Sequence, residues 1–228
     1  MQQYFVSEKI SIGSKIRLNN DDIYHLRKVL RKGSDYTFRI CDRDRDIYLG
    51  HLLEDDSCLI DSYTGENNEL DHDVTCILSL IKSDKFELCI QKLVELGVKR
   101  IVPFSAERSV VKIKDDKKLV RLQKIAREAA EQSHRNLIPE ITPVCTIKDL
   151  KDYMSEYNYI CYESEKRIGE ISPKGSITYL IGPEGGFSDK EYEKICAMGF
   201  ESISLGKRIL RAETAAIYMT SIIAEKCQ

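Results

Sequence analysis

The rest of the chain is organised around the stretch from Tyr179 to Ala216, YLIGPEGGFSDKEYEKICAMGFESISLGKRILRAETAA. It opens on a short apolar run, 179–181, that is typical of a buried parallel strand. The loop Gly182–Phe187 follows at once and holds three glycines and a proline. Glycine accepts backbone angles that are closed to other residues, and it lets a ligand approach the main chain. The loop therefore exposes its backbone.

A second loop of the same kind follows. The S-x-x-E capping box at 188–191 starts a predicted helix, and Gly199 stands where its C-cap belongs. A strand, Ser202–Leu205, then leads into the loop Gly206–Arg211, which runs directly into a helix, Ala212–Lys226. Two glycine loops thus leave the carboxyl ends of two strands and enter two helices. Open α/β sheets bind their ligands at this place.

The identity of that ligand is left open by the spacing. The first loop lacks the Lys-Ser/Thr pair of a P-loop and the glycine spacing of the dinucleotide fingerprint. Ordinary strand-to-helix turns are the alternative for either loop, although the arginines beside the second loop favour a binding site. The pattern alone predicts an unidentified ligand pocket.

The composition indicates a globular protein. The chain has 228 residues, of which 42% are hydrophobic and 32% charged, enough for one large or two modest domains. The beginning of the sequence lacks a signal-peptide pattern and no apolar run reaches transmembrane length, so a cytoplasmic location is expected. The eight cysteines are never closer than 13 positions, which predicts reduced thiols and no metal site.

Residues 1–68 are predicted to form a small β-rich domain with one helix, Asp21–Lys32. Its expected strands are Tyr4–Val6, Ile10–Leu18, Tyr36–Cys41, Ile47–Leu53 and Cys58–Tyr63. The polar stretch ENNELDHD at 66–73 marks the boundary. Residues 74–228 then form the second domain, where strand Val74–Ile81, helix Asp84–Leu96 and strand Arg100–Phe104 predict a parallel α/β sheet. A helix near 147–154 and a strand at 159–162 precede the stretch described first.

Basic residues gather in two places, although the net charge of −2 does not by itself indicate nucleic acid. The first helix would turn Arg27 with Arg31, and Lys28 with Lys32, outward in i, i+4 rows. Between residues 107 and 127, eight basic residues stand against three acids. Such faces are often simply solvated, and phosphate contact is the alternative.

The pair IGPEGGF and LGKRILRAETAA resembles the signature of the SPOUT methyltransferases. More closely, the chain is similar to the ribosomal RNA small subunit methyltransferase E family, which makes 3-methyluridine in 16S rRNA from S-adenosylmethionine. The likeness covers nearly the whole chain. It includes HLRKVLR at 25–31, KSDKFELCIQKLVELGV at 82–98, ERSVVK at 107–112 and EAAEQSHRNLIP at 128–139.

The resemblance implies an α/β fold: a PUA-like or OB-like barrel at 1–68 and a SPOUT domain at 74–228 that ends in a deep trefoil knot, from about Tyr159 onward. It also implies a homodimer and binding to 16S rRNA, as part of the 30S subunit. The hairpin 42–46 departs from the family, because it lacks the usual glycine. The expected cofactor-binding residues are Ile181, Gly182, Pro183, Gly185, Gly186, Leu205, Gly206, Ile209 and Leu210.

For catalysis, the resemblance favours Arg211 as the group that stabilises negative charge on the uracil, with Arg208 as its substitute. Glu184 or Glu131 is the candidate proton acceptor. Glu131, Gln132 and Arg135 are candidates for substrate positioning. The expected RNA-binding residues are Arg27, Lys28, Arg31, Arg108, Lys112 and Arg135. The competing hypotheses are a SPOUT enzyme for tRNA or a ribose 2′-hydroxyl, and a non-catalytic RNA-binding assembly factor.

Overall fold

The computed structural model describes residues 1–112, 116–163, 171 and 174–227. The chain divides into two compact units. The first unit joins Met1–Glu69 to a short later segment, Ala130–Leu137. The second unit holds Leu70–Ala129 and Ile138–Gln228. A division near residue 69 was expected from the sequence, whereas the return of the segment 130–137 to the first unit was not.

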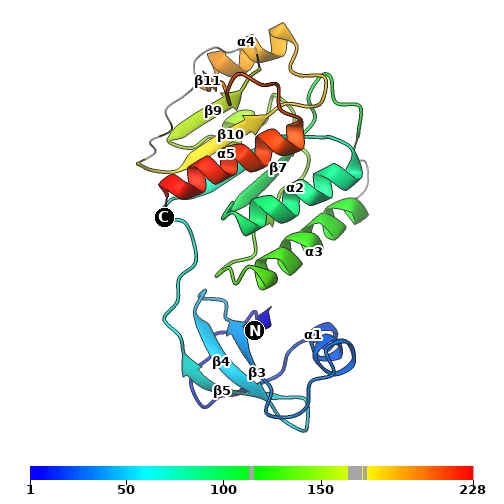
Figure 1. Ribbon diagram of the computed structural model, residues 1–228, viewed down its shortest axis with the longest axis vertical. Helices are drawn as coiled ribbons and strands as arrows, with labels where there is room; N and C mark the ends of the chain where they lie inside the picture. Colours follow the sequence, from blue (N-terminus) through cyan, green and yellow to red (C-terminus); the bar gives the residue numbers. More distant parts are fainter. Residues whose placement is uncertain (113–115, 164–170, 172–173, 228) are drawn as a thin grey trace. The chain divides into compact units, whose positions relative to one another are not determined.

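The first unit is a curled, mixed half-barrel of five strands (Figure 1). In chain order the strands are β1 (Gln3–Phe5), β2 (Lys15–Ile16), β3 (Thr37–Cys41), β4 (Ile47–Leu52) and β5 (Cys58–Tyr63). The sheet order is β1-β3-β4-β5-β2, in which β1 and β3 are parallel and the other pairs antiparallel. Its core includes Tyr4, Leu26 and Phe38, all almost fully buried. This architecture agrees with the expected barrel-like domain.

The helix of the first unit ends earlier than expected. Asn19 caps α1 (Asn20–Tyr24) by accepting from the Asp22 N–H at 2.8 Å. The helix then widens into a π-helical turn, η1 (His25–Val29), and Arg31 has a positive φ of 54°. A left-handed residue cannot continue a helix. The predicted outward rows that include Arg31 and Lys32 are therefore not formed on one continuous helix.

The hairpin between β3 and β4 turns without a glycine. Arg45 takes the left-handed conformation, with a φ of 71°. The carboxylate of Asp42 accepts hydrogen bonds from the backbone N–H groups of Asp44, at 2.8 Å, and Asp46, at 3.0 Å. These bonds are those of an Asx turn, which stabilises such a geometry. The departure from the family pattern is thus accommodated locally.

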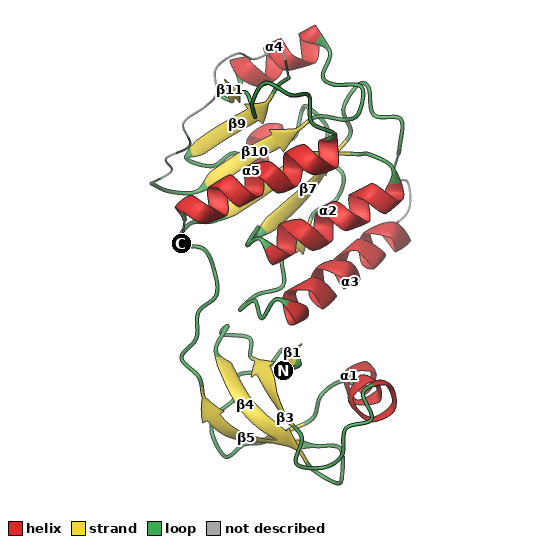
Figure 2. Ribbon diagram, viewed as in Figure 1, coloured by secondary structure: helices red, strands yellow, loops and turns green. Residues whose placement is uncertain are grey.

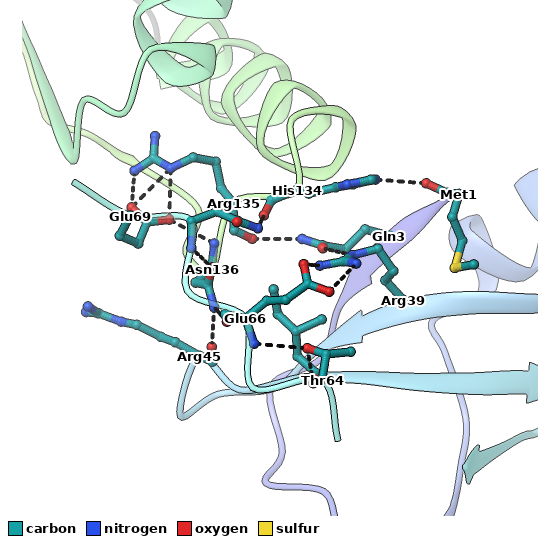
Figure 3. Close-up of polar contacts among 12 residues, drawn as sticks. Met1, Gln3, Arg39, Arg45, Thr64, Glu66, Glu69, His134, Arg135 and Asn136 are labelled. Carbon is teal, nitrogen blue, oxygen red and sulfur yellow. Dashed lines mark hydrogen bonds and ion pairs between the residues drawn. The ribbon is translucent and has the colours of Figure 1, made fainter. Parts of the chain in front are cut away.

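The segment 130–137 is bound to the rest of the first unit by hydrogen bonds and an ion pair between buried residues (Figure 3). The amide of Gln3 donates to the Arg135 carbonyl at 2.7 Å, and the guanidinium of Arg135 pairs with Glu69. Asn136 donates through its amide to the carbonyl groups of Arg45 and Glu66 at 2.8 and 2.9 Å. Because Gln3, Arg135 and Asn136 are nearly fully buried, the segment is an integral part of the unit.

The second unit holds a parallel sheet with the order β11-β9-β10-β6-β7-β8. The strands are β6 (Val74–Ser79), β7 (Arg100–Phe104), β8 (Glu140–Ile141), β9 (Tyr157–Cys161), β10 (Ile177–Ile181) and β11 (Glu201–Ile203). The helices are α2 (Ser83–Glu95), α3 (Asp116–Gln132), η2 (Leu150–Tyr153), α4 (Asp189–Ala197) and α5 (Ala212–Lys226). The parallel α/β architecture expected from the sequence is confirmed.

Helices cover the sheet on both faces. Figure 2 shows α5, α2 and α3 along one face. Side chains alternate along β10, so Tyr179 points toward α5, where it bonds to Thr220, while Leu180 packs on the other face with Ile195 of α4 and Leu150 of η2. The expected helix at 147–154 is only the short 3₁₀ turn η2.

The expected trefoil knot would pass through 164–170 and 172–173, which lie outside the described residues, so it stays a prediction. Among the helices of the described residues, none is both long and apolar enough to cross a membrane. The same residues contain no group of three or more His, Cys, Asp or Glu side chains that could hold a metal ion.

Candidate functional site

The strands β9, β10 and β11 are neighbours in the sheet and run in the same direction, so their carboxyl ends meet at one edge. A pocket of about 360 Å³ lies at this edge. The two glycine loops that follow β10 and β11 form most of its wall. The pocket therefore lies where the sequence predicted a ligand to bind.

The lining contains eight of the nine expected cofactor-binding residues. It also contains Arg211, Glu184 and Arg208, but not Glu131, the other candidate proton acceptor. From the first loop and its strand come Ile181, Gly182, Pro183, Glu184, Gly186 and Phe187. From the second loop and α5 come Ser204, Leu205, Gly206, Lys207, Arg208, Ile209, Leu210, Arg211, Ala212 and Ala215. Gly185 is not in the lining; a Cβ atom there would lie 3.4 Å from Cβ of Arg108.

Two glycines of the lining have backbone conformations that other residues rarely adopt. Gly186 has a φ of +66° and Gly206 a φ of +116°. A Cβ atom on Gly206 would meet nothing within 4 Å, so the space beside it is open. A Cβ atom on Gly182, in contrast, would lie 2.9 Å from the ring of Phe187. Glycine is thus required at Gly182 by packing and at the other two positions by backbone geometry.

The second loop offers its main chain to a ligand. Within the described part of the chain, the backbone N–H groups from Lys207 to Leu210 donate no hydrogen bond to another residue. The side chain of Ile209 is 81% exposed, an unusual position for a large apolar group. Free donors and an uncovered apolar side chain at the pocket suit a ligand with a polar part and a flat apolar part.

Cations outnumber acids around the pocket. The lining holds two carboxylates, Glu163 and Glu184, and four positively charged side chains: Lys85, Lys207, Arg208 and Arg211. Lys85 is paired with Glu213 at 2.8 Å. Arg208 and Arg211 are exposed, and among the described residues neither forms an ion pair. These two arginines are therefore available to a negatively charged or polarised substrate.

Glu184 has a backbone partner. Its Oε1 atom accepts from the N–H of Lys82, the N-cap residue of α2, at 3.4 Å. Carboxylates are favoured at helix N-termini because the helix dipole stabilises them. Glu184 therefore helps to hold the first loop against α2, as well as lining the pocket.

Several residues of the pocket were missed by sequence reasoning. Tyr162 and Glu163 follow β9 directly, and the ring of Tyr162 stacks on Tyr192 of α4 with centroids 4.0 Å apart. Cys161 also lines the pocket, and burial raises the pKa of its thiol, which keeps it neutral. Their position at the carboxyl end of a parallel strand could have predicted that they line the pocket. Sequence reasoning missed them because it relied on glycine-rich stretches directly after a strand, and Tyr162 and Glu163 are not part of one.

The chain is similar to known proteins over nearly its whole length. A family model described as an RNA methyltransferase domain matches residues 68–224. The ribosomal RNA small subunit methyltransferase E of Bacillus subtilis is 36% identical, over 98% of this chain and 96% of that protein. The chain belongs to the ribosomal RNA small subunit methyltransferase E family.

Other members of the methyltransferase E family agree. The protein of that name from Mesomycoplasma hyopneumoniae is 37% identical, over 96% of this chain and 97% of that protein. The crystal structure of the Neisseria gonorrhoeae family member bound to S-adenosyl methionine superimposes with a TM-score of 0.91 at 31% identity, covering 99% and 97% of the two chains. A Legionella pneumophila methyltransferase in complex with the same cofactor gives 0.89 at 27% identity, over 98% and 96%.

The residues expected to bind RNA differ in their exposure in this methyltransferase E fold, and the expectation that Arg135 binds RNA is wrong. Its side chain is only 2% exposed, and its guanidinium pairs with Glu69 at 2.5 Å (Figure 3). A side chain buried to this extent does not reach a phosphate from solution. Arg135 therefore has a structural role, which sequence reasoning missed because its partner lies 66 positions away.

Two other expected RNA contacts also have partners within the protein. Arg27 donates to Asp56 at 2.8 Å and to the carbonyl oxygen of Leu53 at 2.6 Å. Arg108 donates to the carbonyl oxygens of Gly185 at 3.1 Å and Phe187 at 3.2 Å. Arg27 also donates to the Lys32 carbonyl at 3.2 Å, so each of its guanidinium nitrogens has a partner within the protein. An RNA role for either arginine stays a prediction.

The three expected lysine and arginine contacts that remain, Lys28, Arg31 and Lys112, are exposed. Glu131 and Gln132, the other candidates for substrate positioning, belong to the first unit, whereas the pocket lies in the second. Their role in positioning the substrate therefore stays a prediction as well.

Proposed function

We propose that this chain is an S-adenosylmethionine-dependent methyltransferase of the small-subunit ribosomal RNA, and that it methylates N3 of a uridine in 16S rRNA. The observation that carries the proposal is the pocket at the carboxyl ends of β9, β10 and β11, walled by the two glycine loops. The cofactor bound by the Neisseria gonorrhoeae relative supports the same ligand here.

The residues of the pocket fit this cofactor. Gly206 leaves open space where any side chain would intrude, and the backbone donors from Lys207 to Leu210 have no partner among the described residues. A nucleoside is recognised well by such main-chain groups together with apolar side chains, here Ile181, Leu205 and Leu210. When bound, S-adenosylmethionine supplies a methyl group on a positively charged sulfur.

Methylation at N3 requires that the uracil lose the N3 proton, because the neutral imide is a poor nucleophile. As the proton leaves, negative charge spreads onto the two carbonyl oxygens of the base. Arg211 stands at the N-cap of α5, exposed and at the pocket, with no side-chain capping bond of its own. Its guanidinium would stabilise that charge and orient the base. Arg208 lies three positions earlier on the same loop and is the substitute.

Two carboxylates line the pocket and are the candidates for the proton acceptor. Glu184 is one of the two acceptors that the sequence offered, the other being Glu131, and its second oxygen has no hydrogen-bond partner in the described part of the chain. Glu163 is the alternative that only the structure brings into view. Replacing each in turn by glutamine separates them: the true acceptor loses turnover at neutral pH and recovers part of it as pH rises.

N3 lies on the Watson–Crick edge, so the target uridine must be unpaired or flipped out of its helix. We propose that Lys28, Arg31 and Lys112 contact the phosphates around it, since their side chains are exposed. Replacing any one by alanine would then weaken RNA binding and reduce its salt dependence, leaving cofactor affinity unchanged.

We also propose that the protein is a homodimer. The helix α5 is buried on one side against β10 and α2, yet Tyr218 on its other side is 47% exposed, beside the half-buried Ile217 and Ile222. An apolar helix side of this kind is self-complementary about a two-fold axis. Light scattering coupled to size exclusion tests this; a mass of one chain at micromolar concentration would contradict it.

The reaction is tested by incubating the purified protein with S-adenosylmethionine and unmodified 30S subunits, with naked 16S rRNA in parallel. Mass spectrometry of the digested nucleosides is expected to find 3-methyluridine, and the preferred sample identifies the substrate. A different methylated nucleoside would overturn the N3 assignment, and methylation of tRNA alone would overturn the substrate.

The role of Arg211 is tested by Arg211→Ala, with Lys226→Ala at the far end of α5 as the control. The expected result is a fall in turnover of about 100-fold or more at unchanged cofactor affinity, because a preorganised charge partner is lost at the reacting base. Normal turnover of the variant would remove Arg211 from the mechanism.

A further inference from the structure

The segment 105–112, which links β7 to α3, touches the first glycine loop from outside the pocket. One guanidinium nitrogen of Arg108, Nη1, donates to the carbonyl oxygen of Gly185 at 3.1 Å and to that of Phe187 at 3.2 Å. The two carbonyl groups stand on either side of Gly186, the residue of this loop with a positive φ. Arg108 therefore bonds to the loop on both sides of its left-handed residue.

The neighbouring residue strengthens the attachment. The N–H of Glu107 donates to Oε1 of Glu191 at 3.0 Å, and the carboxylate of Glu107 accepts from the hydroxyl of Ser188. Ser188 in turn caps α4 by accepting from the N–H of Glu191. Glu191 is only 3% exposed, so the connection is buried at its Glu191 end, whereas Glu107 is exposed. Segment 105–112 thus fastens both the loop and the start of the following helix.

Apart from these contacts, the loop is held by the bond from the Lys82 N–H to Glu184 and by the buried ring of Phe187. Among the described residues, its internal backbone bonding consists of the N–H of Gly186 donating to the Pro183 carbonyl at 2.9 Å. Gly185 lies against Arg108, where a Cβ atom would approach both the Arg108 side chain and its carbonyl within 3.7 Å. Gly185 thus lies at van der Waals distance from Arg108, outside the pocket lining.

We propose that Arg108 is a positioning residue for the cofactor: it holds Gly185 and Phe187 so that the pocket side of the loop keeps its shape before S-adenosylmethionine arrives. The inference rests on the proposed function, because it takes this pocket to be the cofactor site. It assigns to Arg108 a task on the protein's own main chain, in place of the RNA contact that the resemblance implied.

The consequence is that cofactor affinity depends on a residue outside the pocket lining. Without Arg108 the loop would populate other conformations, and a ligand that needs one of them binds more weakly in proportion to the fraction lost. Hydrogen bonds from a charged group are stronger than neutral ones, but Arg108 is exposed to water, which weakens them. We therefore expect a rise of about tenfold in the dissociation constant, equal to about 1.4 kcal/mol.

The experiment measures binding of S-adenosylmethionine by isothermal titration calorimetry in the absence of RNA. It compares the unaltered protein with Arg108→Ala, Arg108→Lys and Lys190→Ala. The last variant removes an exposed positive charge from the start of α4, close to the loop in sequence, and controls for the change of charge. Thermal unfolding of each variant checks that the fold is retained. Steady-state kinetics then give the KM for cofactor and for RNA separately.

The expected result is a dissociation constant about tenfold higher for Arg108→Ala, a smaller rise for Arg108→Lys and no change for Lys190→Ala. The KM for cofactor rises while the KM for RNA stays the same. An unchanged cofactor affinity in Arg108→Ala, or a rise confined to the KM for RNA, overturns the proposal and returns Arg108 to RNA contact. Failure of the unaltered protein to bind the cofactor would instead overturn the proposed function.

Discussion

The buried link between Tyr179 of β10 and Thr220 of α5 allows a sharp test of how the sheet holds the last helix. The two hydroxyl oxygens are 2.5 Å apart, and both residues are fully buried. The single proton of Thr220 points to the carbonyl of Ala216 at 2.6 Å, so the hydroxyl of Tyr179 is the donor. Cys76 is its other neighbour, and sulfur is a weak acceptor.

The two single substitutions are expected to have unequal costs. Tyr179→Phe removes the donor and leaves Thr220 still bonded to Ala216, so the free energy of unfolding falls by about 1 kcal/mol. Thr220→Val keeps the shape but leaves the buried Tyr179 hydroxyl without its oxygen acceptor, which costs about 2 kcal/mol. In the double variant no polar group is stranded, so it is expected to be no less stable than Thr220→Val alone.

Urea unfolding followed by circular dichroism measures all three variants, with Ser221→Ala as a control, since the hydroxyl of that neighbour on α5 is exposed and bonds only to its own helix. The double-mutant cycle then gives a coupling energy of about 1 kcal/mol. Strict additivity of the two single effects would refute the reasoning, because it would mean that the two hydroxyl groups act independently.

Three further predictions follow from other contacts. Gly186→Val places a β-branched side chain at a φ of +66°, and calorimetry is expected to detect no cofactor binding; an unchanged affinity would move the pocket elsewhere. Burial raises the pKa of Glu191 above its value in the unfolded chain, so the charged carboxylate lowers the stability of the fold as pH rises through that range. Glu191→Gln is therefore expected to raise Tm at pH 8 but not near pH 4. An equal gain in Tm at both pH values would contradict this. Arg135→Ala strands the Glu69 carboxylate and should cost about 3 kcal/mol in urea unfolding, whereas the exposed Lys9→Ala should have no measurable effect; equal effects would refute the burial argument.

Much of the second unit could be predicted from the sequence because its signals are local. The helix Ala212–Lys226 has the bounds that its apolar pattern and preceding loop indicated, and Ser188 caps α4 as the S-x-x-E spacing predicted. The glycine loops predicted the pocket because glycine at the end of a strand permits backbone angles that are closed to other residues and leaves the main chain open to a ligand. The strand Arg100–Phe104 was also correct at both ends.

The rest depended on contacts between distant residues, which no local pattern encodes. The π-helical turn at His25–Val29 keeps the composition of an ordinary helix, so the sequence extended that helix to Lys32. Arg108 and Arg135 were expected to bind RNA because they lie in stretches that match the family. The structure gives each a partner within the protein, the Gly185 carbonyl and Glu69, which lie 77 and 66 positions away. The sequence shows the sign of a charged side chain, but only the fold shows which groups the side chain bonds to.

The membership of 130–137 in the first unit bears on how the chain folds during synthesis. The amide of Gln3, the carbonyl of Glu66 and the carboxylate of Glu69 bond to Arg135 or Asn136, which leave the ribosome much later; Asn136 follows Glu66 by 70 positions. Until then the half-barrel carries these three groups without their partners, so it cannot reach full stability as a nascent chain. Cutting the gene at residue 69 would give the same incomplete fold. The first unit is therefore completed only after a large part of the second has been synthesised.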